Sequence, residues 1–219
     1  MADQLYLSLW FPNFRFDTLP ATLVSVMRQF ALISGNPRVW AASAYPISFN
    51  EAPTYQRLYV NDDRSEETST SLIENAVAEA TEQLHDDTAY EFEMRWNLWA
   101  PDASANQVDE SAALDTLWKR QPATIKIIGF GPGFDDATFE QNGHIRVDFG
   151  LDTPWVLEEE ELDLELGNAA ALHIQKNIEM LLAFTLCVEK HCGISSRLLW
   201  TESGEPLAQK LIDRLQRVN

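Results

Sequence analysis

The sequence contains few basic residues for its size. Lys and Arg together number 16, against 34 Asp and Glu, and the formal net charge is −18. Binding to a nucleic-acid backbone requires clustered Lys and Arg that displace counterions, and an anionic membrane surface attracts the same side chains. We therefore expect no nucleic-acid partner and no membrane partner.

Long apolar runs and cysteines are also scarce. The longest apolar run, residues 180–188, is about half as long as a membrane-spanning helix requires. The first residues show no positively charged segment followed by an apolar one, so no secretory signal is indicated. Cys187 and Cys192 point to different sides of one predicted helix and cannot pair with each other there. These absences predict a cytoplasmic protein without a transmembrane segment.

What the sequence does contain is a pattern of alternating strands and amphipathic helices. Apolar residues make up 45% of the chain and aromatic residues 11%, which is enough for a packed core. Period-two alternation and turn residues predict strands over 5–10, 39–49, 55–60, 91–99, 124–130, 144–151 and 197–200, with a further short one near 162–166. Helical spacing and end signals predict helices over 18–35, 71–85, 109–119, 168–192 and 206–217.

Two of these elements support specific expectations. In strand 91–99 we expect one face in the core and the other in water, as in an antiparallel sheet. The expected core residues are Phe92, Met94, Trp96 and Leu98, and the expected exposed residues are Glu91, Glu93, Arg95 and Asn97. In the longest helix, residues 178–188 are apolar or small except Glu179, which predicts a central buried helix. Leu182→Ala and Phe184→Ala should then each cost about 2–5 kcal/mol.

The two halves of the chain share an element order and a short sequence match. Residues 9–13 (LWFPN) recur as residues 98–102 (LWAPD), an offset of 89. We predict an α+β fold with a largely antiparallel sheet and helices packed on it. The match suggests two tandem ferredoxin-like βαββα units, 1–100 and 101–219, which could also form one continuous domain, and chance remains the alternative explanation.

Acidic residues concentrate in two blocks. Residues 51–115 hold 16 acidic and 3 basic residues, and residues 135–165 hold 11 and 1. An acidic run is usually a solvated face, and its functional alternative is a surface that attracts a basic partner. The candidate partner-binding residues are the acidic Asp62, Asp63, Glu66, Glu67, Glu158, Glu159, Glu160 and Glu161, with the strand-end aromatics Trp10 and Trp99.

Motifs that would carry catalysis or metal binding are incomplete. Residues 129–133 (GFGPG) follow a strand but precede acidic residues rather than a helix, so they indicate a turn. Cys187 and His191 share a helix face but supply only half of a zinc site. His85 with Asp86 and Asp87, and His144 with Asp148, could form acid–base pairs, yet no nucleophile accompanies them. We assign no catalytic residue, metal or cofactor.

The function that these features favour is a non-catalytic protein-interaction or regulatory module with an acidic binding surface. Its partner would be a basic protein or a second copy of the chain. The alternative is an enzyme or small-ligand-binding protein with a cleft between the two units, because many active sites are assembled from dispersed residues.

Overall fold

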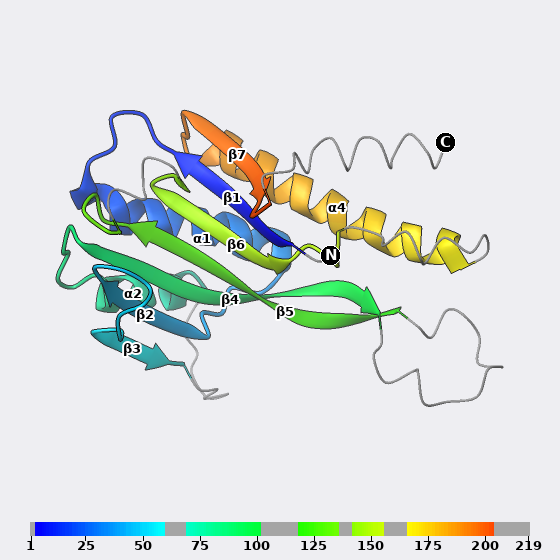
Figure 1. Cartoon of the computed structure of the whole chain (residues 1–219), viewed down its shortest axis with the longest axis horizontal. Helices are drawn as coiled ribbons and strands as arrows, with labels where there is room; N and C mark the ends of the chain where they lie inside the picture. Colours follow the sequence, from blue (N-terminus) through cyan, green and yellow to red (C-terminus); the bar gives the residue numbers. More distant parts are fainter. Residues whose placement is uncertain (1–2, 60–68, 102–117, 136–141, 156–165, 204–219) are drawn as a thin grey trace.

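The computed structural model describes residues 3–59, 69–101, 118–135, 142–155 and 166–203 (Figure 1). The strands are β1 (Gln4–Trp10), β2 (Ala41–Pro46), β3 (Tyr55–Leu58), β4 (Thr88–Pro101), β5 (Trp118–Phe130), β6 (Ile145–Leu151) and β7 (Ser196–Thr201). The helices are α1 (Leu19–Ser34), α2 (Ser69–Ala80) and α4 (Leu166–His191), with a short 3₁₀ turn at Phe16–Thr18.

All seven strands form one antiparallel sheet in the order β3-β2-β4-β5-β6-β1-β7. The protein is therefore an α+β protein, as the sequence predicts. Strands from residues 1–100 and from residues 101–219 lie in the same sheet. The tandem units are not confirmed: β4 pairs directly with β5, whereas β1 and β2, their counterparts in the first half, are separated by three strands.

The three helices lie side by side on one face of the sheet, behind it in the view of Figure 1. α1 is the middle helix and contacts both α2 and α4. Its apolar stripe, Leu23, Val26, Met27 and Phe30, is fully buried, and Gly35 ends the helix in the left-handed conformation that glycine tolerates best. The core thus lies between the helices and one face of the sheet.

β4 confirms the predicted alternation on its core face. Phe92, Met94, Trp96 and Leu98 are at most 1% exposed. On the other face the prediction holds fully only for Asn97, which is exposed, whereas Glu93 and Arg95 are partly buried. For Glu91 it is wrong, because this residue is 6% exposed and its carboxylate contacts Lys126. β4 lies between β2 and β5, and Lys126 of β5 lies beside Glu91 on this face.

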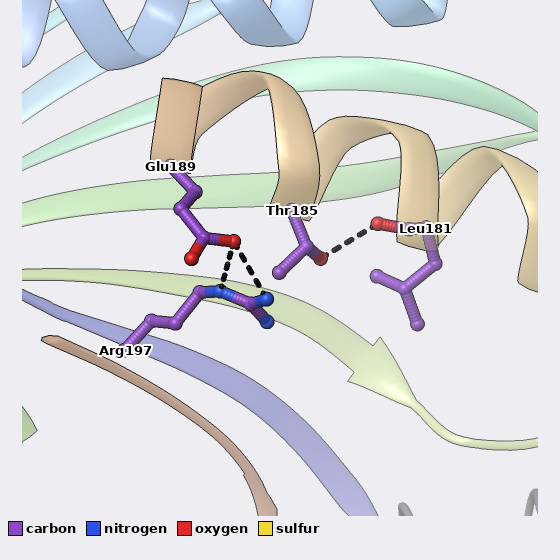
Figure 2. Close-up of polar contacts among 4 residues, drawn as sticks. All are labelled: Leu181, Thr185, Glu189 and Arg197. Carbon is purple, nitrogen blue, oxygen red and sulfur yellow. Dashed lines mark hydrogen bonds and ion pairs between the residues drawn. The ribbon is translucent and has the colours of Figure 1, made fainter. Parts of the chain in front are cut away.

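α4 is amphipathic rather than centrally buried, which corrects the sequence prediction. Phe184 and Leu181 are fully buried, but Leu182 is 44% exposed and Leu186 is 59% exposed. The helix begins at Leu166, two residues before the predicted start. Figure 2 shows that α4 also contacts β7, where Arg197 donates to Glu189 through Nε at 3.2 Å and an Nη nitrogen at 2.8 Å.

Several predicted elements differ from the described ones at their ends. Trp118 and Lys119 belong to β5, not to the end of a helix over 109–119, and residues 109–117 lie outside the described part of the chain. Leu166 belongs to α4. The rest of the predicted strand near 162–166 lies outside the described residues. The same holds for the predicted helix 206–217.

Candidate functional site: the helix-free face of the sheet

The face of the sheet opposite the helices carries a mixture of aromatic and charged side chains. No helix of the described residues packs on this face, since α1, α2 and α4 all lie on the other. Strand alternation and register place a common set of side chains there. They are Tyr6, Ser8, Trp10, Arg146, Asp148, Lys126, Ile128, Phe130, Glu91, Glu93, Arg95, Leu198 and Trp200. We call this surface the helix-free face.

Arg146 of β6 lies near the middle of the helix-free face. Its register partners are Ser8 on β1 and Ile128 on β5. Its guanidinium carbon lies 5.0 Å from the ring centroid of Tyr6 and 5.2 Å from that of Phe130. Because these rings come from the strands on either side of β6, they flank the guanidinium and remove much of its contact with water.

The polar atoms of Arg146 lack acceptors among the described residues. Nε is buried and has no hydrogen-bond partner, and no ion pair to the guanidinium occurs in this part of the chain. Burial lowers the pKa of Arg146 from its usual value, while Tyr6, Asp148 and Glu91 oppose that change. The side chain remains charged, because an arginine in a protein does not deprotonate.

The two described carboxylates that act electrostatically on Arg146, those of Asp148 and Glu91, have other partners. Asp148 accepts a hydrogen bond from Gln4 Nε2 at 2.7 Å and another from the Gly150 N–H at 2.8 Å. Glu91 pairs with Lys126 at 3.1 Å. Burial raises the pKa of Glu91, and the adjacent Lys126 opposes this. Among the described residues, the carboxylates of Asp148 and Glu91 therefore form no ion pair with Arg146.

A small aromatic cluster bounds one side of the Arg146 environment. Phe49, between β2 and β3, lies 5.0 Å from Phe134 and 6.2 Å from Phe130, measured between ring centroids, and its ring is 5.9 Å from the Arg146 guanidinium carbon. Two segments that connect strands thus cover this corner of the sheet. A second, smaller apolar core forms beneath them, with Ala89 and Ile128.

The glycine-rich segment after β5 shapes this corner and is a turn, as predicted. The Gly131 N–H donates to Thr88 O at 2.9 Å, and the Gly133 N–H donates to Asp86 O at 2.7 Å. A Cβ at Gly131 would lie 2.2 Å from Asp86 O, so only glycine allows this approach of two backbones.

The structure separates the residues of the candidate acid–base pair. His144 immediately precedes β6 and Asp148 lies within it, and four residues of extended chain correspond to roughly 13 Å. Nδ1 of His144 accepts the Phe11 N–H at 3.0 Å, and its ring stacks on Phe14 at 4.1 Å. Burial lowers the pKa of His144.

Both cysteine thiols contact polar side chains of α1. The thiol of Cys187 lies 3.2 Å from Gln29 Oε1, and Cys192 accepts from the Ser25 hydroxyl at 3.3 Å. His191 is exposed. Within the described ranges, no three His, Cys, Asp or Glu side chains are grouped to hold a metal ion.

The predicted partner-binding residues fall in different places. Asp62, Asp63, Glu66 and Glu67, with Glu158, Glu159, Glu160 and Glu161, lie outside the described residues. Trp10 lies on the helix-free face at the end of β1, opposite Ser196. Trp99 lies far along β4, where its ring contacts His173 of α4 at 4.0 Å. The structure does not bring the two tryptophans together.

Two residues that the sequence did not single out have clear structural roles. Arg146 was visible only as a polar residue in an alternating strand, and its aromatic neighbours depend on sheet register. Asn177 is fully buried on α4. Its side-chain amide accepts a hydrogen bond from the Trp99 N–H and donates one to the Trp99 carbonyl oxygen. The sequence does carry a signal for this role. Asn177 is an amide on a helix face whose other residues, Ile174, Ile178 and Leu181, are apolar.

Comparison with known proteins adds no assignment. No described helix is both long and apolar enough to cross a membrane. Neither a protein-family model, nor a curated protein, nor a solved structure matches the chain.

Proposed function

We propose that this protein is a non-catalytic binding module that recognises another protein through the helix-free face of its sheet. The observation that carries the proposal is Arg146, a largely desolvated cation without an acceptor among the described residues. It lies on a sheet face that no described helix covers. A residue in this state gains more from a partner than one whose hydrogen bonds are already complete.

The composition of the surroundings supports a protein partner. Tyr, Trp and Arg are the residue types that contribute most to protein–protein binding. Tyr6 and Trp200 contact each other with ring centroids 4.6 Å apart, and the Trp200 Nε1–H donates to Ser8 Oγ at 2.9 Å. These contacts hold the aromatic side chains in place before binding, which lowers the entropy lost on association.

The acidic blocks complete the proposal. With a net charge of −18, the chain attracts a partner that is basic overall. Long-range attraction brings the partner near, and the shorter-range contacts of the helix-free face then select it.

Two exposed leucines provide a matched test. Leu198 on β7 lies on the helix-free face and is 51% exposed, whereas Leu186 on the outer side of α4 is 59% exposed. We expect Leu198→Lys to weaken capture of a partner by about tenfold, and Leu186→Lys to leave it unchanged. Quantitative cross-linking in extracts of the source cells would compare the two variants with the wild-type chain. Equal partner recovery by both variants, or a wild-type chain without partners at low salt, would contradict the proposal.

A further inference from the structure

The donor groups of Arg146 define what kind of group could bind beside it. A guanidinium has five N–H donors in one plane and no acceptor. The rings of Tyr6, Phe130 and Phe49 surround it and attract the cation through their faces. Aromatic rings stabilise the charge but do not replace the oxygen acceptors that the N–H groups require. The Nε–H of the guanidinium is therefore buried without an acceptor within the described residues.

The surroundings of Arg146 favour a singly charged acceptor. Asp148 and Glu91 are close enough to raise the pKa of Arg146 by their negative charge, and both are held by other partners. A dianion such as phosphate would be repelled by both carboxylates. A carboxylate carries half that charge, is planar and can accept two parallel N–H bonds from one guanidinium.

We propose that Arg146 is the binding site for a carboxylate group of the protein partner. This inference rests on the proposed function and specifies its chemistry. A partner that is basic overall approaches the acidic chain, and a carboxylate on its contact surface then pairs with Arg146, which lies between the rings of Tyr6 and Phe130 on the helix-free face. A partner without a correctly placed carboxylate would leave Arg146 buried and unpaired, so the same contact supplies specificity.

Nuclear magnetic resonance can test the site with small probes and no partner protein. The Nε–H signal of Arg146, identified by its loss in Arg146→Lys, would be followed during titration at constant ionic strength. N-acetylglycine presents a main-chain carboxylate, and N-acetylglutamate α-methylamide presents a side-chain one. Arg197 is an internal control, because its Nε already donates to Glu189 (Figure 2).

We expect a saturable shift of the Arg146 signal with a millimolar dissociation constant and little change at Arg197. The probe that binds more tightly identifies the source of the carboxylate as a chain end or a side chain. In Arg146→Lys, the shifts of the backbone amides of Ser8 and Ile128 should require about tenfold more probe, because an ammonium cannot form the paired bonds.

Two results would overturn the carboxylate site. One is an Arg146 signal that does not move, or that moves equally with sodium chloride. The other is tighter binding of inorganic phosphate than of either carboxylate. The titration contains no partner protein, so a negative result would overturn the carboxylate site but not the proposed function, which the comparison of Leu198→Lys with Leu186→Lys tests. Conversely, a leucine comparison that contradicts the proposed function would not change the meaning of a positive titration.

Discussion

Asn177 shows how one side chain can replace a missing strand. Its Oδ1 accepts the Trp99 N–H at 3.0 Å, and its Nδ2 donates to Trp99 O at 2.8 Å and to Pro154 O at 2.7 Å. β2 pairs with β4 only as far as Glu93, so Trp99 lies beyond that neighbour. The amide satisfies backbone groups that would otherwise be buried without partners.

Replacing Asn177 by Asp should therefore destabilise the fold. The carboxylate cannot donate, and it would face two carbonyl oxygens, so we expect a loss of about 2–3 kcal/mol or more. Urea unfolding at neutral pH measures this difference. The control is Asn97→Asp, at an exposed position on β4. This variant should change stability by less than about 0.5 kcal/mol. Similar midpoints for the two variants would show that the Asn177 bonds contribute little.

His144 makes stability depend on pH. Burial lowers its pKa in the folded protein below the usual 6.5, and the neutral ring accepts the Phe11 N–H. The unfolded chain binds the proton more readily, so the contribution of His144 is complete above about pH 6.5 and is lost as pH falls through the folded pKa.

We expect the wild-type chain to lose more stability between pH 7 and pH 5 than His144→Asn. Asparagine does not titrate, and its amide oxygen can still accept from Phe11. Urea midpoints of both proteins at the two pH values give the comparison. Equal losses would assign the pH dependence to other groups.

At the scale of whole elements, α4 illustrates the difference between apolar composition and burial. Its apolar residues lie on all sides of the helix, but only one side packs against the sheet and α1. Phe184 packs edge-on against Phe30 at 5.6 Å and Trp96 at 6.2 Å. Leu182, two residues earlier, points to the opposite side.

The two positions should consequently respond differently to truncation. We expect Phe184→Ala to cost about 3–5 kcal/mol, because it removes contacts and leaves a cavity, and Leu182→Ala to cost less than about 1 kcal/mol. Denaturant unfolding of both variants checks this. If Leu182→Ala lost as much stability as Phe184→Ala, the result would support the sequence prediction of a central buried helix.

Patterns within one element were readable from the sequence, and relations between elements were not. The alternation of Phe92, Met94, Trp96 and Leu98 requires only local periodicity, and the structure confirms it. The burial of Glu91 depends on Lys126 and on β2, and the environment of Arg146 depends on Tyr6 and Phe130 from two other strands. Register across a sheet follows from the whole arrangement of strands, so the candidate site could not be derived from spacing.

For the whole molecule, the charge of −18 is the property that most affects association. Salt shortens the Debye length from about 10 Å at 0.1 M to about 3 Å at 1 M. If residues 62–67 attract the partner, neutralising them should act mainly on the rate of association.

The quadruple variant Asp62→Asn, Asp63→Asn, Glu66→Gln and Glu67→Gln should associate with a native partner about tenfold more slowly at low salt. Its stability should change by less than about 0.5 kcal/mol. Stopped-flow mixing at several salt concentrations measures both the rate and its salt dependence. An unchanged rate and salt slope would show that this acidic run only keeps the surface hydrated.

The position of β1 in the sheet has a consequence for synthesis of the protein on the ribosome. β1 lies between β6 and β7, so Leu7 pairs with Val147 on one side and Leu199 on the other. Both neighbours are translated long after β1 itself. The nascent chain must therefore carry an apolar strand with Leu5, Leu7 and Leu9 and two unpaired edges until β6 and β7 have been made. Such a strand is a target for chaperones and for aggregation.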